Sequence, residues 1–149
     1  MKRIIVISLL LSFILTTSGS WGYKPLEHRV GVTFSNGAHI SAEVVDTKPA
    51  TQRGLMYRDV IGQDEGMFFV FDHEDTYAFW MKNMNFPLDI IWLDSSYKIV
   101  HIEREVPPCD SETCTLYTPS KPARYVLETR AGFYSSSGIN VGDGITLSS

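Results

Sequence analysis

The 149-residue sequence has few cysteines, no excess of positive charge and no long apolar segment in its body. Asp and Glu number 17 against 13 Lys and Arg, a formal net charge of −4, so nucleic acid is not an expected partner. The one long uncharged apolar segment, residues 4–15, falls short of the roughly 18 residues of a membrane-spanning helix. Walker, dinucleotide-binding and Gly-x-Ser-x-Gly motifs are absent, which leaves those enzyme classes without motif support.

The apolar segment has the features of a secretory signal peptide. Two basic residues precede it, and small polar residues follow it up to Ser20. We therefore expect residues 1–20 to be a signal peptide cleaved after Ser20, residues 21–27 to be a linker, and residues 28–149 to form a single β domain. The mature chain would then have no membrane span and would work in the periplasm or outside the cell.

The two cysteines, Cys109 and Cys114, lie within a proline-rich segment, residues 106–122. Export to an oxidising compartment predicts a local disulfide between them, with two free thiols as the alternative. Only Asp110 and Glu112 could add ligands between them, which is a poor zinc set. The four histidines also lack metal-ligand spacing, so we expect neither a metal nor a cofactor; they are His28, His39, His73 and His101.

Short segments rich in β-branched and aromatic residues predict a mainly β fold. The most secure pair is a hairpin of residues 28–34 and 38–45 around Asn36-Gly37, a favoured two-residue turn. Further strands are expected at 67–71, 77–81, 88–93, 97–103, 124–129 and 139–147, and short helices at 48–53 and 131–136. At least seven strands with one or two short helices indicate a β-sandwich, a jelly-roll-like fold or a small barrel.

Several motifs follow one another in an order that resembles a known family. They are Arg53-Gly54-Leu55-Met56-Tyr57-Arg58, Glu65-Gly66-Met67-Phe68-Phe69-Val70-Phe71, Phe79-Trp80-Met81-Lys82-Asn83, Pro87-Leu88-Asp89-Ile90-Ile91, Val106-Pro107-Pro108, Tyr125-Val126-Leu127-Glu128 and Gly142-Asp143. Over residues 30–147 the chain resembles the domain-of-unknown-function 192 family (DUF192, uncharacterised protein family 0127). The resemblance implies a jelly-roll-like β fold and no assigned activity. Met84 stands where a threonine is usual, so binding is expected to differ here if that hydroxyl takes part.

Six charged residues lie within or beside apolar segments, where burial without a partner is costly. They are Arg53, Arg58, Glu65, Lys82, Asp89 and Glu128. One interpretation makes them structural ion pairs; the other makes them a polar pocket in which arginine binds a carboxylate or phosphate. Because the loop of residues 83–87 lies between Lys82 and Asp89, we expect these two to meet at one rim of the sheet.

Three functions remain open at this point. The first is a non-enzymatic binding module that uses the six residues to bind a small anionic or saccharide ligand of the cell envelope. The second is a glycan hydrolase in which Asp89 works with Glu65 or Glu128. The third is an accessory protein that binds another envelope protein through a strand edge or residues 106–122. Trp80 and Trp92 could stack on sugar rings, but we expect both in the core.

Overall fold

A tight turn lies at Gly37, whose φ of +90° suits glycine. In the computed structural model, which describes residues 28–149, the Gly37 N–H donates to the Phe34 carbonyl oxygen at 2.9 Å. Strands β1 (Arg29–Phe34) and β2 (His39–Val45) pair in antiparallel fashion on either side. The predicted hairpin is therefore confirmed. The predicted signal peptide and linker lie outside the described residues.

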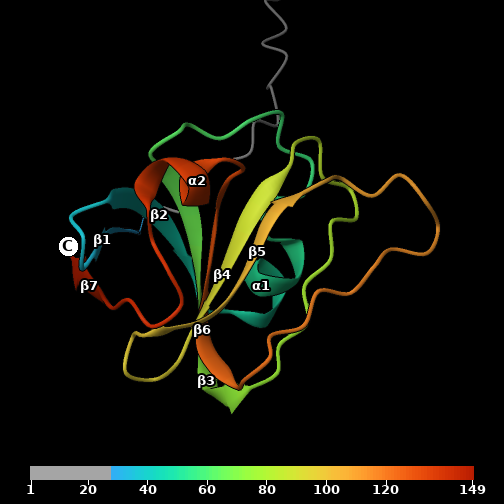
Figure 1. The fold of residues 1–149 in the computed structure, drawn as a ribbon. Helices are drawn as coiled ribbons and strands as arrows, with labels where there is room; N and C mark the ends of the chain where they lie inside the picture. Colours follow the sequence, from blue (N-terminus) through green and yellow to red (C-terminus); the bar gives the residue numbers. More distant parts are fainter. Residues whose placement is uncertain (1–27) are drawn as a thin grey trace, which may run out of the picture.

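The strands join into one curled sheet, a half-barrel seen in Figure 1. After β2 the elements are α1 (Lys48–Arg53), β3 (Glu65–Asp75), β4 (Leu88–Leu93), β5 (Ile99–Val106), β6 (Ala123–Arg130), α2 (Phe133–Ser137) and β7 (Ile145–Ser148). The strand order is β5-β4-β6-β3-β2-β1-β7. Only β2 and β3 are parallel, because α1 lies in the connection between them. The mainly β prediction is confirmed, and among its options the small barrel is the nearest.

The two edges of the sheet approach each other at one end. The Ile145 N–H donates to the Tyr97 carbonyl oxygen at 3.0 Å, and the Ile99 N–H donates to that of Asp143 at 2.9 Å. These bonds join the start of β5 to the start of β7 and curl the sheet around one apolar cluster, the barrel interior. Every strand contributes to that cluster: Val32, Phe34, Ile40, Ala42, Phe68, Ile91, Leu93, Ile99, Tyr125, Leu127, Ile139 and Ile145.

The opposite face of the central strands is also buried. We call the segments that cover it, together with the side chains beneath them, the outer layer. Its cover consists of α1, residues 54–61 and residues 79–86. The cluster beneath it contains Val45, Leu55, Ile61, Met67, Phe69, Met81, Met84, Phe86, Leu88, Ile90, Trp92, Val106, Ala123 and Val126. Strands covered on both faces need apolar residues at consecutive positions, which explains the apolar runs at residues 67–71 of β3 and 90–93 of β4.

The strand predicted at residues 77–81 is wrong. Residues 77–82 make only isolated bridges, from Phe79 to Tyr117 and from Lys82 to Cys109. Both edges of β4 are already paired, with β5 and with β6, so no strand position next to it is free. The segment instead crosses the outer face, where the Phe79 ring packs edge-on against that of Trp92.

Several boundaries also differ from the prediction, two of them by four or more residues. The acidic residues 72–75, expected in a loop, extend β3 to Asp75. The terminal strand begins only at Ile145, because Gly142, with φ of +99°, turns the chain before it. Among residues 28–149, no helix is long and apolar enough to cross a membrane.

Candidate functional site

Two buried carboxylates lie on the outer face of the sheet, one residue apart across the strands. Glu43 of β2 is paired with Met67 of β3, and Met67 is paired with Glu128 of β6. Directly paired residues share a face of the sheet, so both carboxylates point into the outer layer. Glu43 and Glu128 are only 4% and 5% exposed, so each must be explained by its surroundings.

Glu43 is held by a two-pronged ion pair with Arg58. The Nη1 and Nη2 atoms of Arg58 donate to Oε1 and Oε2 of Glu43, both at 2.7 Å. Arg29 of β1 adds a longer contact of 3.3 Å from Nη1 to Oε1 of Glu43. Arg58 comes from the segment after α1, so this pair ties the cover of the outer layer to the sheet. Sequence reasoning selected Arg58 but missed Glu43.

Glu128 lies near this ion pair but differs from Glu43 in its protonation. Burial raises the pKa of Glu128 to about 8, although the Arg58 guanidinium opposes the shift. Its Oε2 accepts no hydrogen bond from any residue of the described part. A Cβ built on Gly54 would lie 3.9 Å from that oxygen, so the chain after α1 passes close over it. Glu128 is therefore a protonated, covered carboxyl group at neutral pH.

A pocket of about 370 Å³ opens on the solvent side of this cover. We call it the arginine pocket; its lining residues are Arg53, Met56, Tyr57, Arg58, Asp59 and Val60. Arg53 is the last residue of α1, and the others follow within one short loop. Tyr57 and Val60 are 66% and 62% exposed, so an aromatic ring and an aliphatic side chain are accessible at this pocket. The structure thus brings two of the six predicted residues, Arg53 and Arg58, to one pocket.

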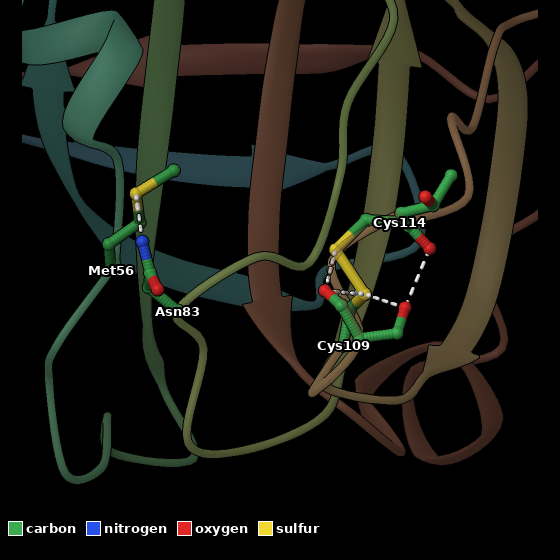
Figure 2. Close-up of a disulfide and its surroundings, with 6 residues drawn as sticks. Met56, Asn83, Cys109 and Cys114 are labelled. Atoms are coloured by element: carbon green, nitrogen blue, oxygen red, sulfur yellow. Dashed lines mark hydrogen bonds between the residues drawn. A yellow bond between two sulfur atoms is a disulfide. The ribbon is translucent and has the colours of Figure 1, made fainter.

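The loop of the pocket is held by the neighbouring segment, residues 79–86. The Tyr57 N–H donates to the Asn83 carbonyl oxygen at 2.9 Å, and Nδ2 of Asn85 donates to the Arg58 carbonyl oxygen at 2.9 Å. Figure 2 shows a further contact, in which Nδ2 of Asn83 donates to Sδ of Met56 at 3.9 Å. The loop that lines the pocket is therefore held in place by Asn83 and Asn85 of the neighbouring segment.

The predicted disulfide is present and lies beside the same segment. Cys109 and Cys114 are bonded in the loop between β5 and β6 (Figure 2). The Cys109 N–H donates to the Met81 carbonyl oxygen at 3.0 Å. Within residues 28–149, no group of three or more His, Cys, Asp or Glu side chains is arranged to bind a metal ion.

Asp89 lies on the other face of the sheet, with the barrel interior. It is fully buried, and its two carboxylate oxygens accept the backbone N–H groups of Glu105 and Tyr134 at 2.7 and 2.8 Å. Asp89 is paired with Thr129, the neighbour of Glu128, so the side chains of Asp89 and Glu128 point to opposite faces. Asp89 is therefore a backbone anchor for β5 and α2.

Glu65 also lies apart from Asp89. It is exposed at the start of β3, where its Oε2 accepts the Gly62 N–H at 2.9 Å and its Oε1 lies 3.5 Å from Nη2 of Arg29. Its strand position places it on the same face as Met67, across the sheet from Asp89. Neither carboxylate pair considered for glycan hydrolysis is therefore assembled on one face.

The predicted meeting of Lys82 and Asp89 is wrong. Asp89 is occupied by two backbone donors, whereas Nζ of Lys82 lies 5.5 Å from the centre of the Trp80 ring. Trp80 is 45% exposed, so the expectation that it belongs to the core is also wrong. Trp92 is fully buried, as expected, and its Nε1 donates to the Tyr77 carbonyl oxygen at 3.0 Å.

Comparisons with known proteins agree with the motifs. The model of the DUF192 family, described as "Uncharacterized ACR", matches residues 31–147. UPF0127 protein TK1120 of Thermococcus kodakarensis is 30% identical over 119 residues, which cover 76% of this chain and 69% of that protein.

Two crystal structures are similar over most of their length. One, of a protein of unknown function from Novosphingobium aromaticivorans, is 31% identical with a TM-score of 0.71 and covers 79% of this chain and 83% of its own. The other, of a candidate transcription regulator from Sinorhizobium meliloti, is 30% identical with a TM-score of 0.72 and covers 80% of this chain and 92% of its own. The chain therefore belongs to the DUF192 (UPF0127) family.

Proposed function

We propose that this domain is a non-catalytic binding module that takes a small ligand carrying both an acid group and hydroxyl groups at the arginine pocket. The observation that carries the proposal is the joint presence of Arg53 and Arg58 in one pocket of about 370 Å³. A guanidinium group can donate two parallel hydrogen bonds to a carboxylate or phosphate. Because Nη1 and Nη2 of Arg58 already donate to Glu43, this role falls to Arg53, and Arg58 adds positive charge beside it.

The surroundings of Arg58 support binding of an anion. Glu43 fixes the guanidinium with two bonds of 2.7 Å, so little side-chain entropy remains to be lost when a ligand binds. The pKa of Glu128, raised to about 8 by burial, keeps this nearby carboxyl group neutral at pH 7. A second negative charge behind the pocket is thereby avoided.

The remaining lining residues narrow the class of ligand. Asp59 offers acceptors that suit ligand hydroxyl groups, and the exposed Tyr57 ring offers an apolar face of the kind that stacks on sugars. Sugar acids, sugar phosphates and hydroxy acids have this combination. Nucleic acid stays an unexpected ligand for a chain with a net charge of −4.

We further propose that binding takes place after export. The Cys109–Cys114 disulfide supports this, since disulfides persist mainly in oxidising compartments. Purification of the processed protein and sequencing of its N-terminus would test cleavage after Ser20. An accessory role through residues 106–122 stays a prediction; Leu116 in that loop is 62% exposed.

Calorimetric titration with inorganic phosphate, citrate and galacturonate tests the binding proposal. We expect at least one of them to bind, and Arg53→Ala to weaken it about 10- to 100-fold, the value of a charge-assisted hydrogen bond. Arg130→Ala removes the same charge from a different pocket and serves as the matched control. Absence of binding by the wild-type protein, or equal affinity in Arg53→Ala, would contradict the proposal.

A further inference from the structure

The loop between β5 and β6, which contains the disulfide and which we call the disulfide loop, contacts the rest of the outer layer at two points. One contact is made by the first cysteine and the other lies after the second cysteine. The Cys109 N–H donates to the Met81 carbonyl oxygen at 3.0 Å. Beyond Cys114, Tyr117 and Phe79 exchange two backbone hydrogen bonds of 2.8 and 2.9 Å. The bridge joins Cys109 to Cys114, three residues before Tyr117, and so shortens the free chain between these two points. It therefore holds residues 79–81 against the loop that connects β5 to β6.

The same segment holds the arginine pocket two residues further on. Asn83 accepts the Tyr57 N–H on its backbone and donates its side-chain amide to Met56, as Figure 2 shows for the latter contact. Asn85 donates to the backbone of Arg58. Three consecutive pocket residues are thus held by two asparagines that stand directly after the part clamped by the disulfide loop.

The backbone where residues 54–61 meet residues 79–86 has an unfavourable conformation that hydrogen bonds between the two segments must stabilise. Tyr57 has φ of +63° and Asn83 has φ of +58°, both in the left-handed region. Asparagine enters this region more readily than most residues, but for a tyrosine it is uncommon and costs free energy. The hydrogen bond that Asn83 accepts from the Tyr57 N–H supports this left-handed turn.

We infer that Cys109 and Cys114 are positioning residues of the arginine pocket: their disulfide fixes residues 79–83, these fix the loop of Tyr57 and Arg58, and reduction loosens that loop. The inference rests on the proposed function for its effect on binding. A dithiol reductant supplies the chemistry. One of its thiolates attacks a sulfur of the bridge, its second thiol resolves the mixed disulfide, and it leaves as a cyclic disulfide while both cysteines become thiols.

Affinity for the anion that binds best among phosphate, citrate and galacturonate is measured on oxidised, dithiothreitol-reduced and reoxidised protein. We expect reduction to weaken binding by about fivefold or more, the usual range of coupling between two sites, and reoxidation to restore it. The Cys109→Ser/Cys114→Ser variant should bind weakly with or without dithiothreitol. Equal affinity of oxidised and reduced protein would overturn the inference and leave the proposed function intact.

Amide hydrogen exchange tests the role of the disulfide separately from the proposed anion binding. If no anion binds the oxidised protein, the proposed function fails, and exchange at the Tyr57 amide then decides the inference. Faster exchange there after reduction supports it, and unchanged exchange overturns it. Circular dichroism shows whether the double serine variant folds; if it does not, the reduced wild-type protein gives the same readouts.

Asn83→Gly tests the intermediate link without touching the disulfide. Glycine keeps the positive φ of this position but removes the amide that reaches Met56. We expect weaker anion binding and faster exchange at Tyr57 in oxidised protein. Asn140→Ala, which removes a side-chain amide bonded to the Gly138 carbonyl oxygen elsewhere in the chain, is the control. Residue 83 keeps the carbonyl that accepts the Tyr57 N–H, so wild-type affinity and exchange in Asn83→Gly would contradict a role of the Asn83 side chain in the relay.

Discussion

The two faces of the central strands each bury a carboxyl group, and the two groups differ in how they are satisfied. Asp89, on the side of the barrel interior, accepts two backbone N–H groups at 2.7 and 2.8 Å. Glu128, one position along on the neighbouring strand but on the outer face, has an oxygen without a hydrogen bond among the described residues and a pKa raised to about 8. The interior carboxylate is thus explained by structure alone. The outer one lies behind the arginine pocket, and a strongly perturbed carboxyl group there marks a candidate site.

The largest effect should come from breaking the ion pair of the outer layer. Glu43→Ala leaves the guanidinium of Arg58 without its two-pronged partner in a mostly buried place, which we expect to lower the free energy of unfolding by about 3–5 kcal/mol. Urea denaturation measures this. The double variant Glu43→Leu/Arg58→Met should recover most of the stability, because an apolar pair of similar volume replaces the charges.

The same double variant sharpens the comparison between the faces. It should fold yet bind the anion more weakly than the wild type, since one of the two arginines of the pocket is gone. If it were as unstable as Glu43→Ala, the charges of the outer layer would be needed for folding. The outer face would then be structural like the barrel interior, and the proposed difference between the two faces would not hold.

A smaller loss is expected from the interior carboxylate. Asp89→Asn keeps the shape but turns one acceptor into a donor, so one of the backbone N–H groups of Glu105 and Tyr134 loses its partner. We expect a cost of about 1–3 kcal/mol in urea denaturation. Anion affinity should stay at the wild-type value because Asp89 and the pocket lie on opposite faces. Weaker binding by folded Asp89→Asn would contradict that separation.

The sequence predicted the parts of the molecule that depend on local pattern. The hairpin at Gly37, the apolar runs of strands covered on both faces and the pairing of Cys109 with Cys114 all follow from neighbouring residues. Residues 77–81 were predicted as a strand because periodicity cannot tell whether a strand edge is free to pair. Here β5 and β6 occupy both edges of β4.

The candidate site was predicted only in part, for a related reason. Glu43 alternates with apolar neighbours in β2, a pattern typical of a strand with one face in solvent. Only the fold shows that residues 54–61 cover this face and that Arg58 meets Glu43 there. Lys82 and Asp89 are near in sequence, but the backbone donors that occupy Asp89 come from distant elements.

The pH dependence of stability tests the protonated state of Glu128. The pKa of this group is about 8 in the folded protein against 4.5 for the free side chain, so between these values the folded state keeps a proton that the unfolded state releases. The free energy of unfolding of the wild type should therefore fall, relative to Glu128→Gln, as pH rises from about 5 to 8, by roughly 1 kcal/mol per pH unit. Above pH 8 the difference should level off.

Urea denaturation of both proteins at several pH values gives this difference directly, because all other titrating groups are shared and cancel. A difference that does not change with pH would mean that Glu128 is ionised in the folded protein at pH 7. The neutral carboxyl group behind the arginine pocket, and with it one support of the binding proposal, would then be lost.

The smallest effect is expected for the tryptophan on the outer side of the cover. Trp80 is 45% exposed and contacts Lys82 through its ring, so Trp80→Ala should cost about 1 kcal/mol or less. Trp92, fully buried beneath the same segment and bonded to the Tyr77 carbonyl oxygen, is the matched comparison at about 3–5 kcal/mol. Similar costs for both would mean that the segment is buried on its two sides. A large difference instead shows that it is a cover with one side in solvent, which leaves its Asn83 end able to respond to what binds beside it.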